Sequence, residues 1–367
     1  MVIINDLLNN INISEINTLI TPFELHNELP ISKKALENVL LYRETIKNIL
    51  NGNDNRLLVI VGPCSIHNVD EAIEYAIKLK ELSIELKDFI VIVMRTYFEK
   101  PRTTIGWKGL INDPDLNNSF NVNKGLRIAR KLLIDINEIG MPTAIEFLDT
   151  ISPQYISDLI SWGAIGARTT ESQLHRELVS GLSMPIGFKN STSGNIQIII
   201  DAIKSSSYSH KFLGINSNGI ASIIKTNGNL HTHSILRGSI NGPNYNQEFI
   251  DCFYNKLLLS NIYPNIVIDC SHDNSYKLYK KQIDVIKYLT LLIENGYNKI
   301  TGIMIESNLN NGNQKLIINK DNKDNKDNKQ ILKYGVSVTD ECIDWDETKR
   351  LLKLLKVAVM KKNYNTI

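Results

Sequence analysis

The sequence of 367 residues contains no hydrophobic run that approaches the ~18 residues of a membrane-spanning helix, so we expect no membrane partner. Its first residues show no basic stretch ahead of an apolar one, which predicts no secretory signal. The four cysteines are scattered and form no Cys-x-x-Cys pair, as expected of a cytoplasmic protein with reduced thiols. Lys and Arg number 41 against 39 Asp and Glu, and this balance argues against a nucleic-acid partner.

Short apolar runs alternate with helical patterns along most of the chain. The run 57–61, closed by Gly62 and Pro63, is typical of a buried parallel strand. Parallel strands need long crossovers, so eight such units predict an α/β fold, a (β/α)8 TIM barrel, with a doubly wound open sheet as the alternative. The expected strands are 57–61, 90–94, 143–147, 164–168, 184–188, 232–237, 265–269 and 300–305. The expected crossover helices are 69–86, 123–139, 153–161, 194–204, 246–260, 276–294 and 345–361.

The barrel pattern has an extension and two interruptions. Residues 1–50 form an N-terminal extension ahead of a barrel that we expect to cover 51–367. Turn sequences at 217–219 and 227–228 predict a β-hairpin insertion over 212–235, to which we assign His231 and His233. The segment 316–333 contains a repetitive Lys-Asp-Asn tract, which predicts a polar mobile loop.

A charged or reactive side chain stands at or just after the end of each expected strand. In a barrel these ends share one face, where active sites are built. In chain order the residues are Cys64, Arg95, Glu146, Arg168, Lys189, Arg237, His272 and Glu306. Four of them are cations, which repel one another when they converge unless an anion supplies the opposite charge. The pattern therefore predicts a pocket for an anionic ligand.

Two further groups of residues have candidate roles at this face. Cys64, His272 and Glu306 follow strands that become neighbours when the barrel closes, and Asp340 could reach over from a later loop. Such a mixed donor set suits Mn²⁺, Fe²⁺, Co²⁺ or Zn²⁺, although spacing alone leaves a packing role equally open. The segment 100–104 (Lys-Pro-Arg-Thr-Thr) resembles a solvated loop in isolation, but its place after the second strand favours a phosphate cradle.

Long ordered motifs in this chain resemble those of the type I 3-deoxy-D-arabino-heptulosonate-7-phosphate (DAHP) synthases. The resemblance covers about residues 13–355 and is carried by 62–67, 94–104, 111–114, 162–173, 235–238, 269–272, 306–308 and 312–314. It departs modestly at Ser191, Ser193 and Ser239, and none of these positions is a proposed metal ligand.

The resemblance implies a metal-dependent condensation of phosphoenolpyruvate with D-erythrose 4-phosphate, the first step of the shikimate pathway. It implies that one divalent ion is held by Cys64, His272, Glu306 and Asp340. Phosphoenolpyruvate would lie among Arg95, Glu146, Ala167, Arg168, Lys189 and Arg237, and erythrose 4-phosphate at Lys100, Pro101, Arg102 and Thr103. Lys100, His272 or a metal-bound water could move the protons, and Cys64 joins Lys100 and His272 as a catalytic candidate.

Regulation by an aromatic amino acid is also implied by the resemblance. The effector site would be lined by Ile13, Pro153, Gln154, Ser183, Phe212, Gly214 and Ile224, in the N-terminal extension and around the hairpin. Glycine at 214 favours tyrosine as the inhibitor. A homodimer or homotetramer is expected, with apolar N-terminal residues suited to a contact between subunits. The alternatives are a 3-deoxy-manno-octulosonate 8-phosphate synthase, which uses arabinose 5-phosphate, and a non-catalytic sensor of aromatic amino acids.

Overall fold

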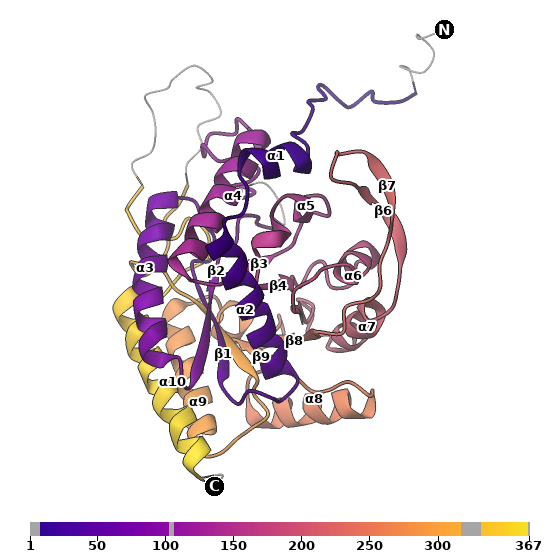
Figure 1. The fold of residues 1–367 in the computed structure, drawn as a ribbon. Coiled ribbons are helices and arrows are strands. Elements are labelled where there is room, and N and C mark those ends of the chain that lie inside the picture. The colour runs from indigo at the N-terminus through magenta and orange to yellow at the C-terminus, as the bar shows by residue number, and fades with distance from the viewer. Residues whose placement is uncertain (1–7, 103–105, 317–331, 366–367) are drawn as a thin grey trace.

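The computed structural model describes residues 8–102, 106–316 and 332–365, and its centre is a closed barrel of parallel strands (Figure 1). The strands follow the order β1-β10-β9-β8-β5-β4-β3-β2, so the predicted TIM barrel is confirmed. The barrel strands are β1 (Leu57–Gly62), β2 (Ile90–Arg95), β3 (Thr143–Glu146), β4 (Trp162–Ile165), β5 (Ile186–Lys189), β8 (Thr232–Leu236), β9 (Ile266–Asp269) and β10 (Gly302–Glu306).

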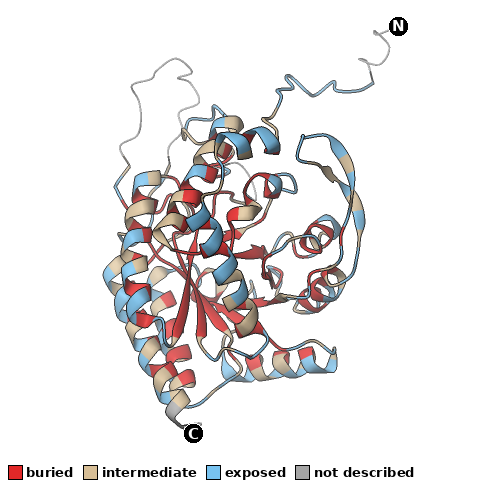
Figure 2. Cartoon of the chain, viewed as in Figure 1, coloured by how far each residue is buried: buried red, intermediate tan, exposed pale blue. Residues whose placement is uncertain are grey.

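Helices cover the outside of the barrel, with their buried residues on the side that faces the strands (Figure 2). In α4, apolar residues at helical spacing such as Leu126, Ala129 and Leu133 are buried, Asn121 caps the start and Gly140 ends it at φ 86°. The helices are α1 (Pro22–Glu28), α2 (Lys33–Leu50), α3 (Val69–Leu86), α4 (Val122–Ile139), α5 (Pro153–Ile156), α6 (Gln173–Val179), α7 (Gln197–Ser206), α8 (Gln247–Leu259), α9 (Tyr279–Glu294) and α10 (Trp345–Asn365).

The region around β4 differs most from the sequence-based expectation. The helix expected over 153–161 is only the single turn α5 followed by a 3₁₀ turn, Ser157–Leu159. The chain then joins the sheet, because the Ser161 amide donates to the Thr143 carbonyl and β4 starts at Trp162, not at residue 164. The fifth barrel strand starts at Ile186, directly after Pro185, which has no amide hydrogen for a ladder bond. Helices α1 and α6 were not predicted.

The hairpin is a separate two-stranded sheet that lies beside α6 and α7 (Figure 1). Strands β6 (Lys211–Ile215) and β7 (Ala221–Lys225) are antiparallel, with Phe212 opposite Ile224, and the turn between them lies at the predicted place. The second turn sequence closes no hairpin. Instead, the Gly228 amide donates to the Ser180 carbonyl and the chain leads into β8.

The N-terminal helix α1 joins the hairpin to the barrel. The Phe23 amide donates to the Ser217 carbonyl at the hairpin tip, at 2.8 Å. On the other side, the Tyr155 hydroxyl of α5 donates to the Ile20 carbonyl at 2.7 Å. Three segments that are far apart in the sequence therefore meet at one edge of the molecule. None of the helices within the described ranges has the combined length and apolar character needed to cross a bilayer.

The interior of the barrel contains a buried histidine that the sequence analysis placed wrongly. His233 belongs to β8 and not to the hairpin, and it is almost fully buried. Its Nε2 accepts a hydrogen bond of 3.1 Å from the indole Nε1–H of Trp162 on β4. Burial lowers the pKa of His233 to about 3, so the ring stays neutral in the folded protein.

We predict that His233 makes the stability of the protein depend on pH. The unfolded chain binds a proton at His233 below about pH 6.5 while the folded chain does not, so this contribution to stability is lost as the pH falls. Relative to His233→Asn, the wild type should lose about 1.4 kcal/mol between pH 7.5 and pH 5.5, measured by urea unfolding. Other titrating groups are common to both proteins and cancel in the difference. A difference that stays constant with pH would contradict the prediction.

Candidate active site

A cavity of about 330 Å³ lies at the end of the barrel where the strands terminate. It brings together most of the residues that sequence analysis selected. The predicted residues in its lining are Cys64, Arg95, Lys100, Pro101, Arg102, Glu146, Ala167, Arg168, Lys189, Arg237, His272 and Asp340. Glu306 is buried next to it, 2.9 Å from Arg95. Thr103 lies outside the described residues.

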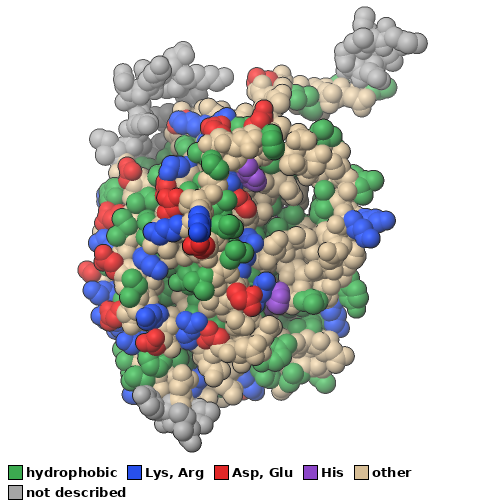
Figure 3. Space-filling view, viewed as in Figure 1, with side chains coloured by type: hydrophobic (Ala, Val, Ile, Leu, Met, Phe, Trp, Pro, Cys, Tyr) green, Lys and Arg blue, Asp and Glu red, His purple; other side chains and the backbone are tan. Residues whose placement is uncertain are grey.

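The lining of the cavity has an excess of positive charge. Seven Lys or Arg side chains and two carboxylates line it. Contrary to our expectation that a ligand alone would balance the cations, several are paired with fixed acids. The pairs are Arg95–Glu306, Lys189–Glu146, Lys189–Asp269 and Arg237–Asp273. These acids allow the cations to converge, and the remaining excess favours an anionic ligand. On the face seen in Figure 3, in contrast, acidic and basic side chains are interspersed.

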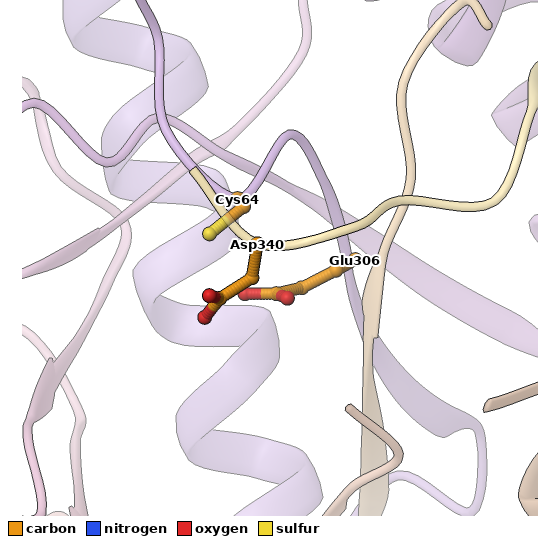
Figure 4. A group of neighbouring side chains, drawn as sticks. All are labelled: Cys64, Glu306 and Asp340. Carbon is orange, nitrogen blue, oxygen red and sulfur yellow. The ribbon is translucent and has the colours of Figure 1, made fainter. Parts of the chain in front are cut away.

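Three potential metal ligands meet beside this cavity. The ligand atoms of Cys64, Glu306 and Asp340 lie within 4.8 Å of one another, and the three side chains point toward a common centre (Figure 4). Strand pairing explains their approach, because Gly62 of β1 lies opposite Glu306 of β10 and Cys64 follows two residues later. Asp340 comes from the loop that precedes α10.

The chemistry of this cluster suits a divalent cation. Burial and, to a smaller extent, the nearby Glu306 carboxylate raise the pKa of the Cys64 thiol to about 11. The ammonium of Lys100, 3.1 Å from Cys64 Sγ, acts in the opposite direction. A thiolate and two carboxylates repel one another at these distances, and a bound Mn²⁺, Fe²⁺, Co²⁺ or Zn²⁺ would stabilise all three ionised forms.

His272, the fourth predicted ligand, lies at the edge of this cluster. Its Nε2 is 3.8 Å from Glu306 Oε1, but it is not within the 4.8 Å group formed by the other three. Its backbone has a φ of 55°, in the left-handed region that a residue with a side chain seldom adopts. Its role as a metal ligand stays a prediction.

Asp269 is a site residue that the sequence analysis did not select. It ends β9 and is fully buried, with one carboxylate oxygen accepting hydrogen bonds from the Ser271 amide and hydroxyl. The other oxygen lies 2.9 Å from His272 Nδ1 and 3.3 Å from Lys189 Nζ. Burial alone would raise the pKa of Asp269, but His272 and Lys189 hold it well below its usual range. Asp269 therefore fixes a predicted metal ligand and a predicted substrate ligand together.

The Lys-Pro-Arg loop forms one wall of the cavity. Lys100 is partly buried, and Arg102 is held by a hydrogen bond of 2.8 Å from its Nε to the Trp107 carbonyl. The guanidinium of Arg168, from the turn after β4, donates to the Pro101 carbonyl at 3.5 Å. Tyr97, Thr192 and Lys277 also line the cavity, although no sequence pattern singled them out.

The seven predicted effector residues are spread over several elements. Phe212 and Gly214 on β6 and Ile224 on β7 lie on the half-buried face of the hairpin. Pro153 and Gln154 belong to α5, Ser183 is exposed before β5, and Ile13 is exposed in the N-terminal segment. Their grouping into one binding site stays a prediction.

Comparisons with known proteins place these features in context. The model of the DAHP synthetase I family matches residues 28–353. The Phe-sensitive phospho-2-dehydro-3-deoxyheptonate aldolase of Escherichia coli strain K12 is 50% identical over 349 residues, 95% of this chain and 97% of that protein. The Trp-sensitive protein of the same strain is 48% identical over 346 residues, 94% and 96% of the two chains. A solved phospho-2-dehydro-3-deoxyheptonate aldolase from Francisella tularensis has a TM-score of 0.91 at 50% identity, covering 96% and 99% of the two chains.

We predict that Asp269→Asn weakens the binding of a divalent cation by about tenfold or more, because partners of metal ligands typically contribute this much. The amide cannot provide the charge that orients His272 and neutralises Lys189. Calorimetric titration with Mn²⁺ measures the effect. Asp251→Asn, which removes a partner of Lys299 on the surface, serves as the control and should bind Mn²⁺ as the wild type does. Equal affinity in both variants would contradict the prediction.

Proposed function

Because the chain belongs to the DAHP synthetase I family and is a DAHP synthase, we propose that it condenses phosphoenolpyruvate with D-erythrose 4-phosphate and water, giving DAHP and inorganic phosphate. One observation of the structure supports this reaction in addition to the family membership. A single cavity is lined by an excess of Lys and Arg and adjoins the Cys64, Glu306 and Asp340 cluster. Two anionic substrates and a divalent cation require such a combination.

In this proposal, the cations of the barrel floor bind phosphoenolpyruvate. Arg95, Lys189 and Arg237 are almost fully buried, so their charges act on the substrate in surroundings of low dielectric constant. Arg168 and the backbone at Ala167 complete this part of the cavity, with Glu146 beside Lys189 at 3.2 Å. These groups neutralise the carboxylate and the phosphate and orient C3 of the substrate toward the second substrate.

Lys100, Pro101 and Arg102 hold erythrose 4-phosphate at the outer part of the cavity in this proposal. Cys64, Glu306, Asp340 and His272 would hold the divalent ion, which when bound supplies a Lewis acid for the aldehyde oxygen. C3 of phosphoenolpyruvate forms a bond to the aldehyde carbon, water adds at C2, and cleavage of the bond between C2 and the phosphate oxygen of the resulting hemiketal phosphate releases phosphate.

Lys100 is the group that we favour for delivering a proton to the aldehyde oxygen. Burial lowers the pKa of Lys100, whereas Cys64, Glu306 and Glu146 raise it, and its pKa lies above the usual value. Lys100 Nζ therefore carries a proton at neutral pH. It belongs to the loop proposed to hold erythrose 4-phosphate and lies 3.1 Å from Cys64 Sγ.

The proposed reaction predicts phosphate release from phosphoenolpyruvate only when erythrose 4-phosphate and a divalent ion are both present. A chelator should abolish the release, and Mn²⁺, Fe²⁺, Co²⁺ or Zn²⁺ should restore it. Cys64→Ala should lower the rate by about 100-fold or more, since even partners of metal ligands contribute ~10–100-fold. Cys252→Ala is the control, because Cys252 is exposed on α8 and distant in sequence from every strand end.

The phosphate-release assay also distinguishes the proposed reaction from the two alternative functions. Release with arabinose 5-phosphate in place of erythrose 4-phosphate would identify the sister synthase instead. Binding of an aromatic amino acid without any turnover would identify a non-catalytic sensor. Full activity after complete removal of metal would exclude the proposed role of the cluster.

We further propose that an aromatic amino acid, with tyrosine favoured, inhibits the enzyme at the hairpin. The relatives from Escherichia coli carry names that denote sensitivity to phenylalanine and to tryptophan. At position 214 an added Cβ would lie 2.9 Å from Ile224 Cγ1, so only glycine leaves this part of the half-buried hairpin face unobstructed. The contact of Phe23 with Ser217 links the N-terminal extension to the same hairpin.

This proposal predicts that tyrosine inhibits phosphate release at concentrations at which phenylalanine does not. Gly214→Ser should raise the tyrosine concentration for half inhibition about tenfold, the equivalent of ~1.4 kcal/mol, because the new side chain displaces Ile224. Leu213→Ser is a matched control on the exposed face of the same strand and should leave the inhibition unchanged. Inhibition by phenylalanine and not by tyrosine would refute the assignment.

A homodimer or homotetramer and a cytoplasmic location complete the proposal. Ile11, Ile13 and Ile16 are exposed on the N-terminal segment, which extends away from the barrel and suits a contact with another subunit (Figure 1). All four cysteines are free thiols in the structure, which supports a reducing compartment.

A further inference from the structure

Tyr97 lies at the floor of the cavity with a hydroxyl group that the protein does not satisfy. The side chain is 1% exposed and lines the cavity two residues after Arg95. Among the described residues, neither the Tyr97 hydroxyl nor Arg95 Nη1 has a hydrogen-bond partner, although both atoms are buried. Buried polar groups in proteins are nearly always paired, so two unpaired donors at one cavity point to a ligand that completes them.

The ring of Tyr97 is also in contact with the cations of the cavity. The Arg95 guanidinium carbon lies 4.1 Å from the centre of the ring, within the range of a cation–π interaction. Lys100 Nζ lies 5.5 Å from the same centre. The ring therefore contacts Arg95 of the proposed phosphoenolpyruvate subsite and Lys100 of the proposed erythrose 4-phosphate subsite. The hydroxyl lies near the charges of Arg95, Lys189 and Glu146.

A second buried tyrosine shows what a purely structural hydroxyl does in this fold. Tyr75 on α3 is as fully buried as Tyr97, and its hydroxyl donates to Ser307 Oγ at 2.9 Å. It does not line the cavity. The two tyrosines thus have the same burial and differ in whether the protein itself provides a partner.

We propose that the Tyr97 hydroxyl donates a hydrogen bond to an anionic oxygen of bound phosphoenolpyruvate, beside Arg95 Nη1, while its ring holds the Arg95 guanidinium in place. The inference rests on the proposed function, because it assigns a further contact to the same substrate. A hydrogen bond to a charged oxygen in a buried site contributes strongly to binding.

The test compares Tyr97→Phe, Tyr97→Leu and Tyr75→Phe in the Mn²⁺-loaded enzyme. Calorimetric titration measures the affinity for phosphoenolpyruvate, and urea unfolding measures stability. Tyr97→Phe should bind phosphoenolpyruvate about 10- to 100-fold more weakly with no loss of stability, because no internal hydrogen bond is removed. Tyr97→Leu should bind phosphoenolpyruvate still more weakly, because the Arg95 guanidinium loses the aromatic ring that it packs against. Tyr75→Phe should show the reverse, with wild-type affinity and a lower unfolding midpoint.

Each outcome of the test has a distinct meaning. If the wild type does not bind phosphoenolpyruvate, the proposed function and this inference both fail. If the wild type binds it and Tyr97→Phe binds it equally well, only the inference fails. Loss of stability in Tyr97→Phe would mean that the hydroxyl has a hydrogen-bond partner within the protein, and this result would also overturn the inference. A parallel titration with inorganic phosphate shows which group is contacted: weakening there as well identifies the phosphate, and weakening with phosphoenolpyruvate alone identifies the carboxylate.

Discussion

The buried ion pair between Arg95 and Glu306 is the contact on which the site depends. The two residues end strands β2 and β10, which flank β1, and they meet at 2.9 Å with almost no exposure to solvent. Arg95 belongs to the cationic lining of the cavity, and Glu306 belongs to the candidate metal cluster. Removing either partner would leave a buried charge uncompensated. The pair therefore connects the proposed substrate site with the candidate metal cluster, and both depend on closure of the barrel around β1.

Other buried cations around the cavity are also paired with fixed acids. Lys189 is neutralised by Glu146 and Asp269, and Arg237 by Asp273, so each buried cation has an acid that comes from a different strand or loop. These acids lower the cost of gathering positive charge before any substrate arrives. The excess that remains is concentrated in the cavity, while the net charge of the whole chain is only +2. The proposed anionic substrates would thus be attracted to one place without making the protein generally basic.

The hairpin and helix α1 are arranged differently from the residues that line the cavity. The hairpin packs outside the barrel. Ser217 at its tip accepts a hydrogen bond from the Phe23 amide of α1, and Ile20, just before α1, accepts one from the Tyr155 hydroxyl of α5. Both contacts lie in segments with many exposed residues, so their local stability is lower than that of the buried strands. A proposed effector bound there would act on elements that can move without unfolding the barrel.

Apolar runs that alternate with helical patterns were sufficient to predict the eight strands and the barrel, because buried parallel strands leave a local pattern. The charged residues at the strand ends predicted a cationic cavity, whereas Ala167 and the assignment of residues to each substrate came from the family resemblance. The sequence could not predict that 153–161 forms only short turns, that His233 faces the barrel interior, or that Asp269 and Tyr97 belong to the site. Those features depend on strand register and on partners distant in sequence, such as Lys189 for Asp269 and Trp162 for His233. A local pattern specifies which face of an element is buried, whereas closure of the barrel alone decides which side chains meet across it.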